Sequence, residues 1–172
     1  SALFTSFFTS KPHWLRHLGL FGRFLDDVFG FWNGSWELFR EFSQDLNSWC
    51  TEIGWKVQFE LVQFAGHVSF LDLEVYKNDG GIWHTQLFFK TTDAHAYLSP
   101  KSAHEPHITN NIPKAVAVRV RRACSESHTF KVFRHLFVDI FFPNRGYDKR
   151  VVKDAFWEIS PFNCTYESVL AK

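Results

Sequence analysis

The sequence predicts an α+β protein in which a small antiparallel sheet is followed by a bundle of three helices. Three observations predict this class. Apolar and polar residues alternate in several segments of residues 20–89, separated by turn sequences, which is typical of β-hairpins. A helical period interrupts them once, over residues 35–50, and continues without strands from Pro113 onward. The composition, 45% hydrophobic and 19% aromatic, is that of a chain with a packed core rather than a disordered one.

The first predicted hairpin covers residues 20–32, and its apolar strands enclose two adjacent carboxylates, Asp26 and Asp27. Aspartate is common at a bend because the bend is solvated and aspartate tolerates turn dihedrals. Two interpretations remain open from the spacing alone. The pair is either an ordinary surface turn or a turn that holds two carboxylates for a divalent ion.

The next predicted elements are a helix and two strands. A turn and N-cap signal precedes apolar residues at helical spacing, which predicts a helix over residues 35–50. Strict alternation then predicts half-buried strands over residues 56–61 and 69–77. On the second of these, Asp72 and Glu74 share the outer face, where a solvent-facing edge is the simplest interpretation.

The turn sequence at residues 78–81 predicts a hairpin with a partner strand over residues 82–90. Residues 91–112 are polar and histidine-rich, so an irregular connection is expected there. His95, His104 and His107 lie in it, but without nearby cysteines they are a weak zinc signal. They are better interpreted as loop residues that pack or contact a nucleic-acid backbone.

Three helices are predicted in the remainder, residues 113–160, followed by a tail over residues 161–172. Pro113 suits a first helical position, and the helix continues to Cys124. The second helix begins near Ser125 or Ser127, and the third near Asp148. The expected inward residues of the three are Val116, Val120 and Ala123; Phe130, Phe133, Phe137 and Phe141; and Val151, Val152, Ala155 and Phe156.

Charge is distributed unevenly along the chain. Residues 1–112 contain 8 Lys and Arg against 12 Asp and Glu, whereas residues 113–172 contain 11 against 6. A basic face of a helix is often only a solvated surface. Here residues 113–153 contain ten basic groups and three acidic ones, which favours binding of a polyanion. The candidates for nucleic-acid binding are Lys114, Arg119, Arg121, Arg122, Lys149, Arg150 and Lys153, and three short basic helices also fit a helix-turn-helix module.

The cysteines, the lengths of the apolar runs and the absence of Met give further expectations about the location and completeness of the chain. Cys50, Cys124 and Cys164 are widely spaced, which predicts reduced, buried thiols in an intracellular protein. No apolar run approaches 18 residues and no signal-peptide pattern is present, so no membrane partner is expected. The sequence contains no Met, which suggests that it is a piece of a longer protein.

The segment from Phe24 to Asp27 resembles the aromatic-x-Asp-Asp motif of reverse transcriptases. The resemblance extends to the Penelope-like retroelements, relatives of telomerase in their polymerase core, over roughly residues 14–157. It is carried by an ordered series of segments: RFLDDVFGFW, SFLDLEVYK, WHTQLFFKTTDAHAYL, SAHEPH, IPKAVAVRVRRACSE and NRGYDKRVV.

This resemblance implies a right-hand polymerase, with part of the palm in residues 1–90 and the thumb in residues 113–160. Asp26 would be a metal ligand for Mg²⁺ or Mn²⁺ and a catalytic residue, together with Asp27 beside it near the primer terminus. Phe24 would pack under the end of the template–primer duplex, and Lys90 would join the nucleic-acid contacts. The implied partners are an RNA template, a DNA primer and deoxynucleoside triphosphates, in the nucleus.

The sequence departs from the family at one essential point. The family has fingers and a further palm strand with a metal-binding Asp before the Asp-Asp hairpin, and this chain has no acidic residue before Asp26. We therefore expect a palm-and-thumb fragment that is inactive by itself, because one hairpin holds two metal ions poorly. The alternative is a non-catalytic helix-turn-helix protein, derived from such an element, that binds nucleic acid.

Overall fold

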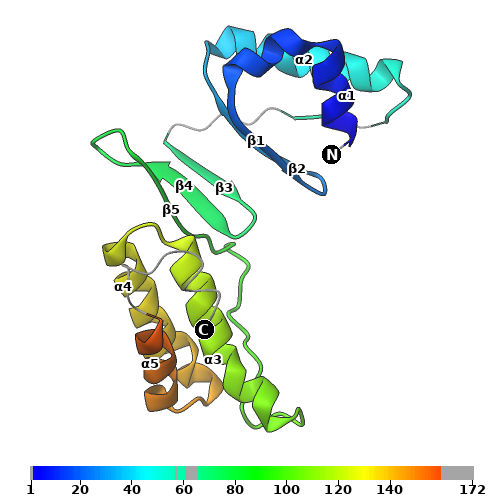
Figure 1. The fold of residues 1–172 in the computed structure, drawn as a ribbon. Helices are drawn as coiled ribbons and strands as arrows, with labels where there is room; N and C mark the ends of the chain where they lie inside the picture. Colours follow the sequence, from blue (N-terminus) through cyan, green and yellow to red (C-terminus); the bar gives the residue numbers. More distant parts are fainter. Residues whose placement is uncertain (1, 57, 61–65, 160–172) are drawn as a thin grey trace. The chain divides into compact units, whose positions relative to one another are not determined.

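The computed structural model describes residues 2–56, 58–60 and 66–159 (Figure 1). They belong to two compact units, one that ends at residue 65 and one that begins at Gly66. Each unit combines helices with a small antiparallel sheet, so the α+β class is confirmed. The single predicted sheet is wrong, since the described strands form one two-stranded and one three-stranded sheet. The three-stranded sheet belongs to the same unit as the basic helices, whereas the sequence placed the boundary at residue 90.

Unit 1 contains the hairpin and the helix that the sequence predicted, preceded by two further helical segments. Its elements are α1 (Ala2–Ser10), η1 (Pro12–His17), β1 (Leu18–Phe24), β2 (Asp27–Trp32) and α2 (Trp36–Glu52). The start of α2 is fixed by Ser35, whose hydroxyl oxygen accepts a hydrogen bond from the Leu38 N–H at 3.3 Å. No clean periodicity marks residues 1–18, so α1 and η1 were not predicted.

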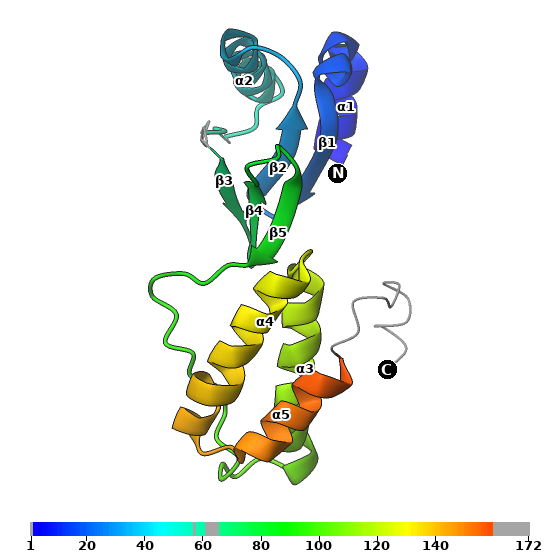
Figure 2. The same ribbon diagram turned by 90° about the vertical axis from the view of Figure 1, so that its left-hand side faces the viewer.

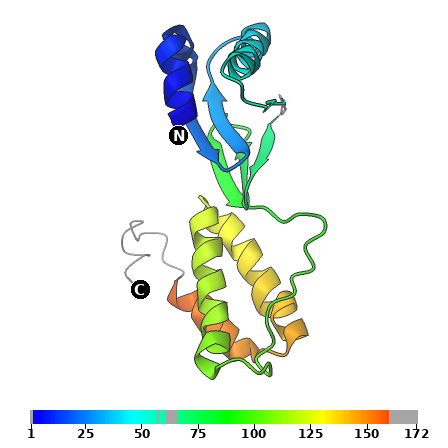
Figure 3. The same cartoon turned by 90° about the vertical axis from the view of Figure 1, so that its right-hand side faces the viewer.

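The core of unit 1 is largely aromatic. Helices α1 and α2 pack against the β1–β2 hairpin (Figure 3). Phe7 is fully buried and meets Phe42 and Trp49 edge-on, with ring centroids 6.0 and 5.5 Å apart. Cys50 is a buried free thiol in this cluster, and burial raises its pKa. The buried residues Phe42, Leu46 and Trp49 have the helical spacing from which the helix was predicted, and this face of α2 packs against the hairpin.

The strand predicted over residues 56–61 is wrong wherever that segment is described. Residues 56 and 58–60 have no strand structure, and residues 57 and 61 lie outside the described part of the chain. The Asn47 side chain makes the hydrogen bonds to the Phe59 backbone that a neighbouring strand would make in a sheet. Its amide donates to the Phe59 carbonyl at 3.0 Å and its carbonyl oxygen accepts from the Phe59 N–H at 2.7 Å. Alternation alone could not show this, because a side chain satisfies the backbone groups.

The sheet of unit 2 consists of β3 (His67–Phe70), β4 (Leu73–Lys77) and β5 (Trp83–Leu87), paired antiparallel in that order. The predicted β4–β5 hairpin is confirmed. The single strand predicted over residues 69–77 is wrong, because the chain reverses at Leu71 and Asp72 so that Phe70 pairs with Leu73. Leu71 has a φ of +57°, a conformation that its sequence does not signal.

The helices of unit 2 are α3 (Pro106–Ala123), α4 (Ser127–Leu136), η2 (Phe137–Phe141), η3 (Pro143–Arg145) and α5 (Lys149–Glu158), and α3, α4 and α5 lie side by side (Figures 1 and 2). The Asp148 side chain caps α5 by accepting from the Arg150 N–H at 2.7 Å. The beginning of α4 and α5 is as predicted. Of all the described helices, none is both long and apolar enough to cross a membrane.

The first helix of the bundle begins seven residues earlier than predicted, at Pro106 instead of Pro113, so residues 106–112 are not an irregular connection. Pro113 lies inside α3, where it lacks the N–H that would bond to the carbonyl of Thr109. The Tyr147 hydroxyl lies 3.2 Å from that carbonyl oxygen and 2.8 Å from the carbonyl oxygen of Leu98, and can donate to either. A tertiary contact thus compensates the missing helical hydrogen bond.

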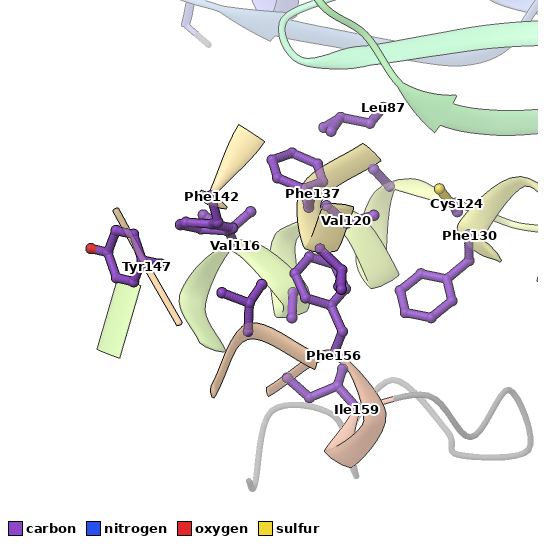
Figure 4. Packing of buried hydrophobic residues seen from close by; sticks show 14 residues of the cluster. Leu87, Val116, Val120, Cys124, Phe130, Phe137, Phe142, Tyr147, Phe156 and Ile159 are labelled. Carbon is purple, nitrogen blue, oxygen red and sulfur yellow. The ribbon is translucent and has the colours of Figure 1, made fainter. Parts of the chain in front are cut away.

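The core of unit 2 lies among the three helices and beneath the sheet (Figure 4). Helix α4 continues into η2, a single π-helical turn in which the Phe142 N–H donates to the Phe137 carbonyl at 3.2 Å. Five-residue spacing brings Phe137 and Phe142 to the same side, and both are fully buried. Val152 and Phe156 are buried as predicted, but Val151 is exposed, which corrects the predicted inward face of α5.

Candidate nucleic-acid interface

Asp26 and Asp27 lie at the exposed bend of the β1–β2 hairpin, as predicted. Strand β1 ends at Phe24 and β2 begins at Asp27, and these two residues pair across the hairpin. Only Leu25 and Asp26 form the turn, so the two strands fix the backbone on both sides of it. Phe24 and both aspartates are solvent-exposed. The turn can therefore present adjacent carboxylates to a ligand.

The turn is backbone-strained at Leu25, which has a φ of +52° and is 72% exposed. A two-residue hairpin with a left-handed first position normally takes glycine there, because a side chain in that region costs about 1–2 kcal/mol. The same tripeptide, Phe-Leu-Asp, forms the β3–β4 turn, where Leu71 has a φ of +57°. Both hairpins therefore turn on a left-handed leucine followed by an aspartate.

Replacing Leu25 with glycine is expected to stabilise unit 1 by about 0.5–1 kcal/mol, because glycine relieves the left-handed strain but loses more entropy on folding. The measurement is urea denaturation followed by circular dichroism. Leu20→Gly is the matched control: Leu20 is a similarly exposed leucine in strand β1, where the same change should destabilise by about 0.5–1 kcal/mol. If Leu25→Gly destabilised the protein, the interpretation that Leu25 is strained would be contradicted.

The carboxylates of Asp26 and Asp27 are hard oxygen ligands of the kind that Mg²⁺ and Mn²⁺ take in phosphoryl-transfer sites. A two-metal site needs further ligands beyond one such pair. Within residues 2–56, 58–60 and 66–159, no group of three or more His, Cys, Asp or Glu side chains is placed to hold a metal ion. The pair fits part of a metal site, and the described residues do not complete it.

The basic side chains of α3 differ in what they contact. Arg119 forms an ion pair with Asp72 in the β3–β4 turn, with Nε and Oδ2 2.8 Å apart, and so ties the sheet to the helix. Asp72 is therefore not a free solvent-facing edge. Lys114 pairs with Glu158 of α5 at 3.3 Å, and the half-buried Arg121 reaches the Cys124 carbonyl at 3.4 Å. Arg122 is solvent-exposed in the last turn of this helix.

The basic side chains of α5 and of Lys90 are all solvent-exposed. Lys149 contacts Asp139 of η2, and this hydrogen bond is the main cause of a lowered pKa of the Asp139 carboxyl. Arg150 lies 3.6 Å from Asp148, and Lys153 lies over the ring of Trp157 at 5.7 Å. All of these cations except Lys90 lie on elements of the helical bundle, which gives unit 2 a basic helical surface.

Sequence reasoning missed two basic residues of α4, Lys131 and Arg134, together with Trp157 of α5. The guanidinium carbon of Arg134 lies 4.6 Å from the centroid of the Trp157 ring. Lys131 and Arg134 are three residues apart on α4, and Lys149 and Lys153 are four residues apart on α5. Each spacing places two cations on one face of its helix, and this was the signal available in the sequence. Only the packing of the two helices shows that these residues belong together.

The histidines of the connection do not converge. His95 is half-buried and stacks on Phe141, with ring centroids 3.9 Å apart, whereas His104 and His107 are exposed. Of the three histidines, His95 is therefore the one that packs, as expected from the sequence for such loop residues. Cys124 is buried beside the helical core, and burial raises the pKa of its thiol to about 11, so it remains protonated and unreactive at neutral pH.

Comparisons of the chain with protein-family models, curated proteins and solved structures gave no match. Two arrangements of the described residues bear on the function of the chain. One is the exposed pair of carboxylates in unit 1, and the other is the basic helical surface of unit 2.

Proposed function

We propose that this chain is a palm-and-thumb portion of a Penelope-like reverse transcriptase that binds a template–primer duplex and does not extend it alone. The observation that carries this proposal is the exposed two-residue turn that joins two strands and presents Asp26 and Asp27 next to Phe24. An ordinary surface turn needs neither adjacent carboxylates nor the aromatic residue before them. The complete enzyme would use RNA as the template and act in the nucleus.

In this proposal the residues of the chain position nucleic acid and supply part of a metal site. Asp26 and Asp27 would hold Mg²⁺ or Mn²⁺, which in the complete enzyme supplies Lewis-acid stabilisation of nucleotidyl transfer from a deoxynucleoside triphosphate. Phe24 would contact the terminal base pair of the duplex. The basic helices of unit 2 would neutralise backbone phosphates, since lysine and arginine contacts to phosphate supply sequence-independent affinity.

The alternative is a nucleic-acid-binding protein without catalysis. It is favoured by the core of unit 2, in which the basic helices and the sheet pack together without the Asp-Asp turn of unit 1. It is also favoured by the incomplete set of carboxylates in the described residues. The two proposals differ in whether the Asp-Asp turn binds a divalent ion.

Fluorescence anisotropy with a labelled RNA–DNA template–primer duplex tests the shared part of both proposals. We expect saturable binding at low salt and no primer extension with Mg²⁺ and deoxynucleoside triphosphates. Absence of saturable binding would overturn both proposals. Extension that is lost in Asp26→Asn/Asp27→Asn would show a catalytic chain and contradict the expected inactivity.

Mn²⁺ titration monitored by NMR distinguishes the two proposals. A metal-binding turn should show paramagnetic broadening of the amides of residues 24–28 at lower Mn²⁺ concentration than the amides around Glu37 and Glu41, exposed carboxylates one helical turn apart on α2. Asp26→Asn/Asp27→Asn should abolish the difference. Equal broadening at both places in the wild-type chain would favour the non-catalytic protein.

A further inference from the structure

A pocket of about 290 Å³ lies in unit 2 between α4, η2 and α5. Its walls come from two segments, residues 131–139 and 149–157, which meet because α5 packs against η2, the continuation of α4. The residues that line it are Lys131, Arg134, His135, Val138, Asp139, Lys149, Lys153 and Trp157. Four permanent cations and a histidine therefore surround one carboxylate.

The single carboxylate of the pocket, that of Asp139, already has partners within the protein. Asp139 contacts Lys149 and also His135, whose Nδ1 lies 2.5 Å from Oδ2. In the described part of the chain, Lys131, Arg134 and Lys153 form no ion pair with a carboxylate. Three like charges thus line one small cavity without an anionic partner. Such an arrangement costs repulsion in the free protein and is relieved by a bound anion.

Trp157 holds two of these cations at the pocket. Arg134 of α4 and Lys153 of α5 lie 4.6 and 5.7 Å from the centroid of its ring, both within the range of a cation–π contact. These contacts restrict two long side chains before any ligand binds, which lowers the entropy cost of binding. An arginine fork flanked by lysines matches the oxygens of a phosphate group, since the fork can donate two parallel hydrogen bonds.

We infer that this pocket binds a backbone phosphate of the nucleic acid, with Arg134, Lys131 and Lys153 as its ligands. The inference rests on the proposed function for the identity of the partner. It adds a defined phosphate site on α4 and α5, distinct from the arginines of α3. Asp139 acts as a positioning residue that holds Lys149 at the rim. Trp157 forms one wall and is 58% exposed.

The test uses Lys131→Gln/Lys153→Gln in the full chain, because both lysines are exposed and their loss should leave folding intact. The matched control is Lys77→Gln/Lys101→Gln, which removes the same charge from the same unit. Lys77 also lies over a tryptophan ring, that of Trp83, at 5.5 Å. Melting temperatures of both variants equal to that of the wild type would show that neither change acts through stability.

Two probes are titrated. With the RNA–DNA duplex, the pocket variant should bind at least tenfold more weakly than the control, with a slope of log K against log salt that is flatter by one to two. With inorganic pyrophosphate, the indole N–H resonance of Trp157, assigned with Trp157→Phe, should shift saturably in the wild type and the control. The shift should be absent in the pocket variant.

The outcomes separate this inference from the proposed function. A pyrophosphate shift in a chain that does not bind the duplex would support an anion site in the pocket but overturn nucleic acid as its partner, together with the proposed function. Duplex binding that is equal in the pocket variant and the control, with no pyrophosphate shift of Trp157, would overturn the pocket and leave the proposed function standing.

Discussion

Raising the salt concentration from 50 to 200 mM is expected to weaken binding of a template–primer duplex to this chain by about a thousandfold. Each neutralised phosphate contributes about −0.9 to the slope of log K against log salt on duplex DNA. Ten basic and three acidic residues lie in residues 113–153, and the exposed ones provide about six contacts. A slope near −5 follows, which a titration at five salt concentrations measures directly.

Variants on α3 show which cations supply that slope. Arg122→Ala should flatten it by about one, the value for one lost phosphate contact. Arg119→Ala alone should flatten it less, because the ion pair with Asp72 already satisfies part of the Arg119 charge. The double variant should flatten the slope by one to two and weaken binding about equally for unrelated sequences.

The control for charge is Asp26→Asn, which should leave the slope unchanged or make it slightly steeper, since an acid near the duplex only repels it. If Arg119→Ala/Arg122→Ala keeps the wild-type slope, the surface of α3 is an ordinary solvated face. The assignment of these helices to a thumb would then lose its physical basis.

Phe137→Ala is expected to lower the free energy of unfolding of unit 2 by about 3–5 kcal/mol. The ring is fully buried and lies against five other aromatic rings, those of Phe89, Tyr97, Phe141, Phe142 and Phe156. Removing it leaves a cavity that a π-helical turn between two packed helices cannot close. The expected loss is a large share of the stability of a small domain.

Hydrogen exchange of the α3 and α5 amides reads the stability of unit 2 directly. In Phe137→Ala these amides should exchange about a hundredfold or more faster. Val132→Ala, on the half-exposed side of α4, is the control and should change the exchange little. A loss below about 1 kcal/mol in Phe137→Ala would show that the core relaxes around the missing ring.

Elements with local signals were predicted from the sequence. The turn at the Asp-Asp pair, the Ser35 cap of α2, the glycine turn between β4 and β5 and the Asp148 cap of α5 all act within a few residues. The fully buried phenylalanines 130, 137 and 156 were also predicted, because their helical spacing is a property of the sequence alone. The carboxylate pair of the candidate site was found for the same reason.

Elements whose backbone groups are satisfied at a distance were not predicted. Alternation at residues 56–61 is a strand pattern, but Asn47 bonds the backbone of Phe59. Pro113 looks like a helix start, but Tyr147 bonds the carbonyl that the proline leaves free. Leu71 reverses the chain in a left-handed conformation that no residue of its sequence signals. In the first two cases the deciding partner is a residue distant in the sequence.

The sequence by itself determined the α+β class, the exposed Asp26–Asp27 turn and the concentration of positive charge in residues 113–153. Tertiary structure decided which of those charges are available. It pairs Arg119 with Asp72 and Lys114 with Glu158, and it brings Arg134 and Lys153 to the ring of Trp157. A charge count is a property of composition. An anion site depends on which cations share a cavity in excess of its carboxylates, and only the packing of α4 and η2 against α5 sets that.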